Sequence, residues 1–69
     1  MANQWYKTVD SCCRHWQRVD GRTLALFFRE WEDMSAAYKT LRTYGGQVQS
    51  LSFEKLCGLW LMICREPKV

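Results

Sequence analysis

Residues 53–65, with the sequence FEKLCGLWLMICR, carry the densest run of apolar side chains in the chain. Ser52 precedes this run as an N-cap residue, and Leu51 with Leu56 matches the hydrophobic staple found at helix starts. The pattern therefore predicts a helix over 53–65. Its apolar residues spread over roughly 260° of the helix circumference, which is typical of a helix at the centre of a core or an interface.

A longer helix is predicted over 22–44, before the break at Gly45 and Gly46. Its apolar residues recur at steps of three and four, the spacing of a buried helical stripe. The stripe consists of Leu24, Phe27, Trp31, Met34, Tyr38 and Leu41. Further apolar residues on both flanks make it wider than one packing face requires, so we expect two faces of this helix to be occupied.

A first helix is predicted over 3–19, and Asp20-Gly21 ends it because glycine accepts the left-handed conformation that terminates helices. Its stripe also steps by three and four and consists of Trp5, Val9, Cys12, Trp16 and Val19. With a tail over 66–69, the chain is interpreted as one all-α domain spanning 1–69. This small three-helix domain has a long central helix and a short apolar third helix.

The second and third helices carry more apolar surface than a three-helix monomer can cover. Exposed apolar patches of more than a few hundred Å² are rare on monomers and usually mark interaction sites. We therefore expect a homodimer, since symmetric pairing is the commonest oligomeric form. The residues assigned to the dimer interface are Phe28, Leu59, Trp60, Leu61, Met62 and Ile63.

Size and composition narrow the class of protein. The chain has 69 residues, 48% of them hydrophobic, and a net charge of +3. Its longest uncharged apolar run, 56–64, is far shorter than the ~20 residues of a membrane span. Residues 1–6 are polar and aromatic, so we expect no signal peptide, reduced cysteines and a cytoplasmic location.

The sequence predicts no enzyme, cofactor or metal site. The only histidine, His15, is three residues from Cys12, a spacing at which two helical side chains can meet. Cys12 belongs to the apolar stripe, however, and no oxyanion-forming turn is nearby. The four cysteines also lack the paired two-to-four-residue spacing of structural zinc sites.

Basic and aromatic residues are the candidates for partner binding. Lys7, Arg14 and Arg18 form a stripe on the predicted first helix, and Arg22 follows the turn. Arginine is enriched at protein contacts because its planar fork pairs with carboxylates. Tyr38 and Tyr44 are expected to place their rings in the same kind of interface. A solvated face is the alternative interpretation of the stripe, and core packing is the alternative for the tyrosines.

These features predict a non-enzymatic protein-protein interaction module that binds a larger protein, with an acidic or apolar patch, and modulates or inhibits it. In style it is similar to the small host-directed regulators that phages and mobile elements encode, although no residue motif supports that analogy. One alternative is a small DNA-binding transcriptional regulator that uses the basic first helix. Against it, Glu30, Glu32 and Asp33 would repel phosphate. A second alternative is a subunit or assembly factor whose apolar third helix is covered by another chain.

Overall fold

The chain folds around a four-stranded antiparallel sheet. The computed structural model describes residues 2–67, so residues 68–69 of the predicted tail lie outside it. In chain order the elements are α1 (Ala2–Cys12), β1 (His15–Arg18), β2 (Thr23–Phe28), α2 (Trp31–Thr43), β3 (Gln47–Glu54) and β4 (Leu59–Arg65). The expected all-α, three-helix fold is therefore wrong, and the protein is a small α+β domain.

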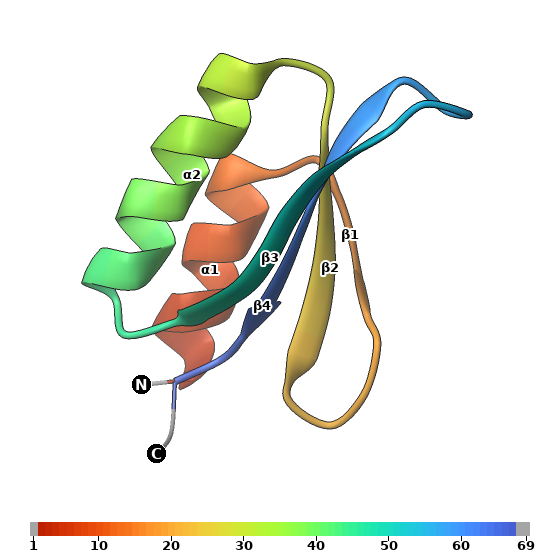
Figure 1. Cartoon of the computed structure of the whole chain (residues 1–69). Helices are drawn as coiled ribbons and strands as arrows, with labels where there is room; N and C mark the ends of the chain where they lie inside the picture. Colours follow the sequence, from red (N-terminus) through yellow and green to blue (C-terminus); the bar gives the residue numbers. More distant parts are fainter. Residues whose placement is uncertain (1, 68–69) are drawn as a thin grey trace.

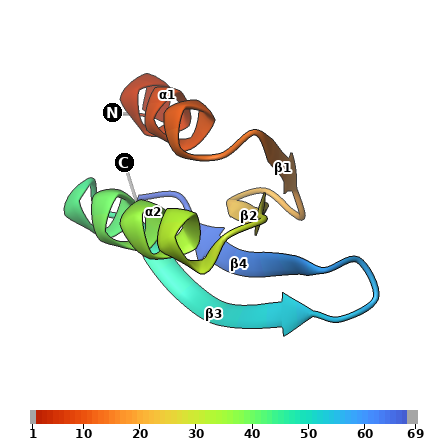
Figure 2. The same cartoon turned by 90° about the horizontal axis from the view of Figure 1, so that it is seen from above.

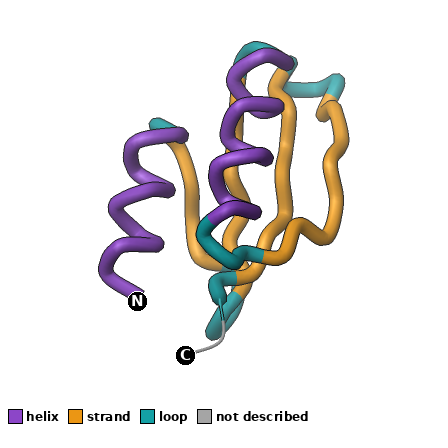
Figure 3. Tube along the Cα trace, turned by 90° about the vertical axis from the view of Figure 1, so that its left-hand side faces the viewer, coloured by secondary structure: helices purple, strands orange, loops and turns teal. Residues whose placement is uncertain are grey.

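The strands lie in the order β1-β2-β4-β3, so β2 and β4 are central and β1 and β3 form the edges. Both helices lie on the same side of the sheet, with α1 beside α2 (Figures 1 and 2). Figure 3 shows the two helices in front of the strands. Within residues 2–67, no helix or strand covers the opposite face of the sheet.

The first helix is shorter than the predicted 3–19 because the chain leaves the helical conformation after Cys12. Trp5 and Val9 are buried, as their helical spacing predicts. Trp16 packs against the same core from β1, whereas Val19 is 56% exposed. Val9 and Trp16 are seven residues apart, which is the spacing of two helical turns. The same two residues can nevertheless pack on one core when the helix ends between them and Trp16 lies on a strand. Periodicity therefore did not locate the helix end.

The predicted helix 22–44 is divided between β2 and α2. Only 31–43 is helical, and its buried residues, Met34, Ala37 and Leu41, keep the predicted steps of three and four. The first part, TLALFF, is β2. A continuous apolar run of four to eight residues fits a buried strand as well as a helical segment. Because β2 pairs with a strand on each side, it has the apolar character of a central strand.

The predicted helix 53–65 is instead the end of β3, a turn over 55–58, and β4. The turn requires Gly58, whose φ of +67° lies in the left-handed region that side chains disfavour. Glu54 closes the turn by accepting a hydrogen bond from Gly58 N at 2.8 Å. The wide apolar sector attributed to a helix belongs to a central strand with apolar residues on both faces.

The core lies between the helices and the sheet. Its side chains come from both helices, from β2 and β4, and from the link after α1. The cluster consists of Trp5, Val9, Cys13, Leu24, Leu26, Phe28, Met34, Ala37, Leu41, Met62 and Cys64. Full burial of a large apolar side chain stabilises a fold by roughly 1.5–3 kcal/mol, so this layer supplies the main driving force for folding.

Candidate functional site

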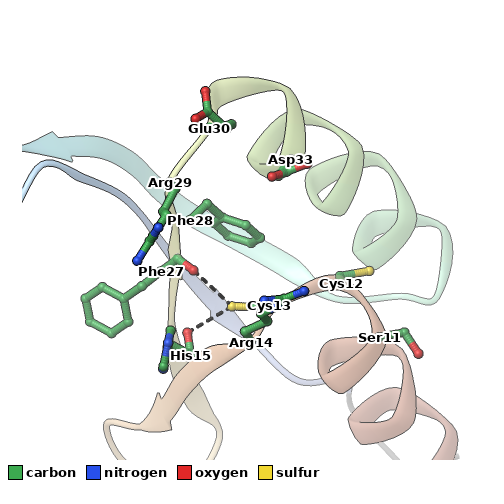
Figure 4. Close-up of a pocket in the computed structure, with 10 residues that line it drawn as sticks. All are labelled: Ser11, Cys12, Cys13, Arg14, His15, Phe27, Phe28, Arg29, Glu30 and Asp33. Carbon is green, nitrogen blue, oxygen red and sulfur yellow. Dashed lines mark hydrogen bonds between the residues drawn. The ribbon is translucent and has the colours of Figure 1, made fainter.

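A cavity of about 500 Å³ lies where the link between α1 and β1 approaches the link between β2 and α2 (Figure 4). This cavity is a candidate reactive site, because thiols, a histidine and charged groups line it. Its lining residues are Ser11, Cys12, Cys13, Arg14, His15, Phe27, Phe28, Arg29, Glu30 and Asp33.

The thiols of this cavity are poor nucleophiles. Cys13 Sγ shares its single S–H hydrogen between two backbone carbonyls, His15 O at 2.9 Å and Phe27 O at 3.2 Å. Burial raises the pKa of Cys13 and also that of Cys12. Since the thiolate is the reactive form, both residues are less reactive at neutral pH than a free cysteine. His15 lies in β1, so the helical Cys12–His15 arrangement considered from the sequence does not form.

Charges of both signs line the cavity, with Arg14 and Arg29 opposed by Glu30 and Asp33. This mixture gives no uniform field for an anionic or a cationic ligand. Among the described residues, no group of three or more histidine, cysteine or carboxylate side chains is arranged to hold a metal ion.

The predicted basic stripe is not formed, because its members lie on different elements. Lys7 is exposed on α1, and Arg14 is exposed in the link that follows it. Arg18, on β1, donates to Tyr6 Oη and, at 2.7 Å, to Gly21 O. Arg22 Nη2 donates to Glu66 O at 3.0 Å.

Arg18 and Arg22 instead belong to a structural network. Tyr6 donates to Glu66 Oε2 and accepts from Arg18, so α1, the end of β1 and the segment after β4 are joined. Burial, followed by the hydrogen bond to Glu66, raises the pKa of Tyr6. These contacts engage two of the arginines within the chain itself.

The two predicted tyrosines lie on α2 and directly after it, and not on the elements that carry the four basic residues. Tyr38 is half-buried against the core, and its hydroxyl accepts a hydrogen bond from Arg42 Nη1 at 2.9 Å. Tyr44 is exposed at the C-terminal end of α2. The six predicted partner-binding residues therefore come from α1, β1, α2 and the segments between elements, and not from one helical face.

The uncovered face of the sheet has an apolar centre. Side chains alternate along a strand, and Trp60, Met62 and Cys64 of β4 point toward the helices. Leu59, Leu61 and Ile63 consequently point to the other face, where each is half-buried.

Phe27 of β2 lies opposite Leu61 and extends this apolar centre. Figure 4 shows the rings of Phe27 and Phe28 on opposite sides of β2. We refer to Phe27, Leu59, Leu61 and Ile63 as the open-face cluster.

Polar residues of the two edge strands surround the open-face cluster. On β1, His15 lies beside Phe27 and Gln17 lies beside Ala25. On β3, Ser50 lies beside Ile63 and Ser52 beside Leu61. An apolar centre with a polar, solvent-accessible rim is the usual anatomy of a protein interface.

A second exposed apolar surface lies on the helix side of the sheet, toward the β3–β4 turn. The ring of Trp60 packs against Trp31 at 5.2 Å and against Phe53 at 5.0 Å between centroids. Trp31 and Phe53 are nevertheless 48% and 46% exposed. Leu51, on the same face of β3, is 41% exposed.

The residues assigned to a dimer interface from the sequence are thus distributed over three places. Phe28 and Met62 are buried in the core of the single chain, so they are not accessible to a partner. Leu59, Leu61 and Ile63 belong to the open-face cluster, and Trp60 packs in the aromatic group with Trp31. The sequence interpretation overlooked Phe27, Leu51 and Phe53 as surface residues. The alternation of Leu51 and Phe53 with serines along β3 is the signal that a strand assignment would have used, whereas the uniformly apolar β2 gives no such signal for Phe27.

Comparison of the chain with protein-family models, with curated proteins and with solved structures gave no match. Among the described residues, no helix has the length and apolar character needed to cross a membrane.

Proposed function

We propose that the chain is a non-enzymatic protein-binding domain that acts stoichiometrically on a larger protein through the uncovered face of its sheet. The observation that carries this proposal is the open-face cluster, an apolar centre on β2 and β4 within a rim of serine, glutamine and histidine. Leucine, isoleucine and phenylalanine gain most from leaving water, so a partner that covers them gains affinity.

The open shape of the sheet face favours a protein partner over a small ligand. An open sheet face has no walls, whereas small-molecule sites are concave and enclose most of the ligand. The partner surface should be apolar at its centre and able to hydrogen-bond at its rim. Since the chain's four cysteines are all unpaired, we assign this activity to the cytoplasm, where thiols stay reduced.

The DNA-binding alternative has lost its main support. It required Lys7, Arg14 and Arg18 on one helical face, and these residues lie on a helix, a link and a strand. A subunit or assembly role is compatible with the same open face, since it differs only in how permanently the partner covers the cluster.

The test is affinity capture from a lysate of the producing organism, with quantitative mass spectrometry. Leu61→Lys and Ile63→Lys each place a charge at the centre of the open-face cluster, while the lysine stem preserves some packing. Proteins bound through this face should be depleted by at least about tenfold, the effect of losing one central anchor residue. Val19→Lys is the matched control, because Val19 is exposed in the β1–β2 turn and is no part of the cluster.

Circular dichroism would verify that each variant is folded. The proposal fails if the wild type and both open-face variants capture the same proteins in the same amounts. A shift of DNA mobility that survives the lysine substitutions would favour the nucleic-acid alternative instead.

A further inference from the structure

The outer edge of β3 offers backbone hydrogen-bonding groups to another strand. β3 spans Gln47–Glu54 and pairs with β4 on one side, while no described strand pairs with its other side. The other edge strand, β1, has only four residues. An edge of this kind is a template for strand addition unless charge, proline or a bulge blocks it.

The regular part of this edge is unprotected. The irregularity in β3 falls between Val48 and Ser50, so the ladder is regular over 50–54. Residues 47–53 contain neither a proline nor a charged side chain, and Glu54 is the first charge along the strand. Natural sheets usually place lysine, proline or a bulge at such positions, and the bulge here protects only the beginning of the strand.

Apolar side chains lie beside this edge on the helix side. Leu51 and Phe53 alternate with serines along β3, and Trp31 extends the surface from the start of α2. We call Leu51, Phe53 and Trp31 the edge patch. Strand addition at β3 would cover Leu51 and Phe53 while it satisfies the backbone, so the two features point to one event.

We propose that β3 pairs antiparallel with β3 of a second copy of this chain, about a two-fold axis that passes through Ser52. The resulting sheet would be continuous across both copies, with the helices of both on the same side. A two-fold axis perpendicular to the sheet keeps each face on its own side. Facing residues must therefore lie on the same face of the strand, which means that their two residue numbers add up to an even number.

Every axis that passes through a residue satisfies this condition, and we compare the three centres from Leu51 to Phe53, which lie at the middle of the regular segment. A centre at Ser52 places Leu51 opposite Phe53 of the second copy, twice by symmetry. A centre at Leu51 would place Phe53 opposite Gln49, and a centre at Phe53 would place Leu51 opposite Lys55. Only the first centre pairs apolar with apolar at both positions, and aromatic–aliphatic cross-strand pairs stabilise sheets.

The charges and the serines agree with this register. With Ser52 at the axis, Glu54 lies opposite Ser50 of the second copy, so no like charges oppose each other within the paired residues 50–54. Hydroxyls of serine can donate to the facing carboxylate. The pairing is isologous, which is the common arrangement of symmetric dimers.

The area involved indicates a weak dimer. Aromatic side chains present roughly 150–250 Å² each, so the exposed halves of Trp31 and Phe53 amount to about 100 Å² apiece. Even with Leu51 and five paired residues per strand, the two copies together bury less than the ~1,200–2,000 Å² of specific, stable interfaces. We expect a dissociation constant on the order of 10–100 µM.

Sedimentation velocity between about 5 and 500 µM measures this equilibrium. The wild type should shift from an 8.2 kDa monomer toward a dimer as concentration rises. The double substitution Leu51→Lys with Phe53→Lys should weaken dimerisation at least about tenfold, because lysine blocks strand edges. Val19→Lys, which places the same charge on an exposed position remote from β3, should leave the equilibrium unchanged.

A second experiment tests the register independently of affinity. In a Cys57→Ser background, Ser52→Cys places two thiols at the axis, where mild oxidation should give a disulfide-linked dimer. Ser50→Cys is the matched control, since position 50 faces Glu54 of the second copy. Both serines are exposed, so neither change disturbs the core.

Four results would overturn the proposal. The first is a monomer at every concentration, and the second is a dimer that the Leu51→Lys, Phe53→Lys double substitution does not weaken. The third is a dimer that Leu61→Lys abolishes, and the fourth is equal cross-linking at positions 50 and 52. The dimer tests change the outer edge of β3, whereas the capture experiment changes the open-face cluster. Failure of the dimer can therefore be distinguished from failure of the proposed function.

Discussion

The absence of a side chain at Gly46 determines how closely the Trp5 ring of α1 approaches the link between α2 and β3. A Cβ built at Gly46 would lie 2.5 Å from Trp5 Cζ3 and against Cη2, and 3.1 Å from Leu41 O. Trp5 is 1% exposed, so its ring cannot move into solvent without opening the core. Gly46→Ala therefore forces α1 away from the rest of the fold.

The magnitude follows from two opposing effects. Overpacking of a filled core costs about 1–3 kcal/mol. Replacing glycine by alanine at a compatible backbone position stabilises by about 0.4–1 kcal/mol through the unfolded state. The net expectation is a loss of about 1–2 kcal/mol, or roughly 4–15 °C in Tm for a domain of this size. Thermal and urea unfolding followed by circular dichroism would measure it.

Two further variants separate the clash from other causes. Gly21→Ala is the matched control, because nothing lies within 4 Å of a Cβ at that position and its effect should be neutral or slightly stabilising. Trp5→Phe removes the two ring atoms that the new methyl group meets. In that background Gly46→Ala should cost almost nothing, giving a coupling energy of about 1–2 kcal/mol. Equal costs of Gly46→Ala in both backgrounds would refute the reasoning.

Other variants and conditions test the turn glycine, a turn carboxylate and the thiols. Gly58→Ala should lower stability by about 1–2 kcal/mol in urea unfolding, because φ is +67° there and the left-handed region is costly for alanine. Hydrogen bonds from Arg22 and Thr23 lower the pKa of Asp20 below its ordinary 3.8, so its contribution to stability is present above that pH and is lost as the pH falls through the lowered value. Asp20→Asn should flatten this acid limb in melting curves from pH 5 to about pH 2, and an unchanged limb would contradict the assignment. Burial raises the pKa of Cys64 to about 11, so iodoacetamide at about pH 8 should modify exposed Cys57 rapidly and Cys64 only on unfolding; equal rates would contradict the packing.

The buried stripe of α2, its C-terminal end and several core residues were predictable from local pattern, although the predicted helix 22–44 also included the strand β2. Met34, Ala37 and Leu41 step by three and four, and they form the buried side of α2. Gly45 and Gly46 were correctly placed after a helix. These features depend on neighbours within a few turns, which a short window of sequence contains.

The candidate surfaces were only partly predictable. Leu61 and Ile63 were selected because the apolar residues of 53–65 exceeded what a monomer can cover, and both lie on the uncovered face of the sheet. The interpretation of the same run as a helix also selected Met62, which the alternation of β4 buries in the core. Phe27 was placed in a helical stripe, although as a strand residue it faces away from Phe28.

By itself the sequence determined which segments are apolar, the breaks at Asp20-Gly21 and Gly45-Gly46, and the buried stripe of the helix α2. Whether TLALFF and LWLMICR become helices or strands was decided only by the tertiary structure. Both segments are apolar on two faces, because each lies in the middle of the sheet and forms hydrogen bonds on both edges. A period of two is therefore absent from them. Their pairing with each other joins Thr23–Phe28 to residues 60–65, and that long-range stabilisation has no trace in either segment alone.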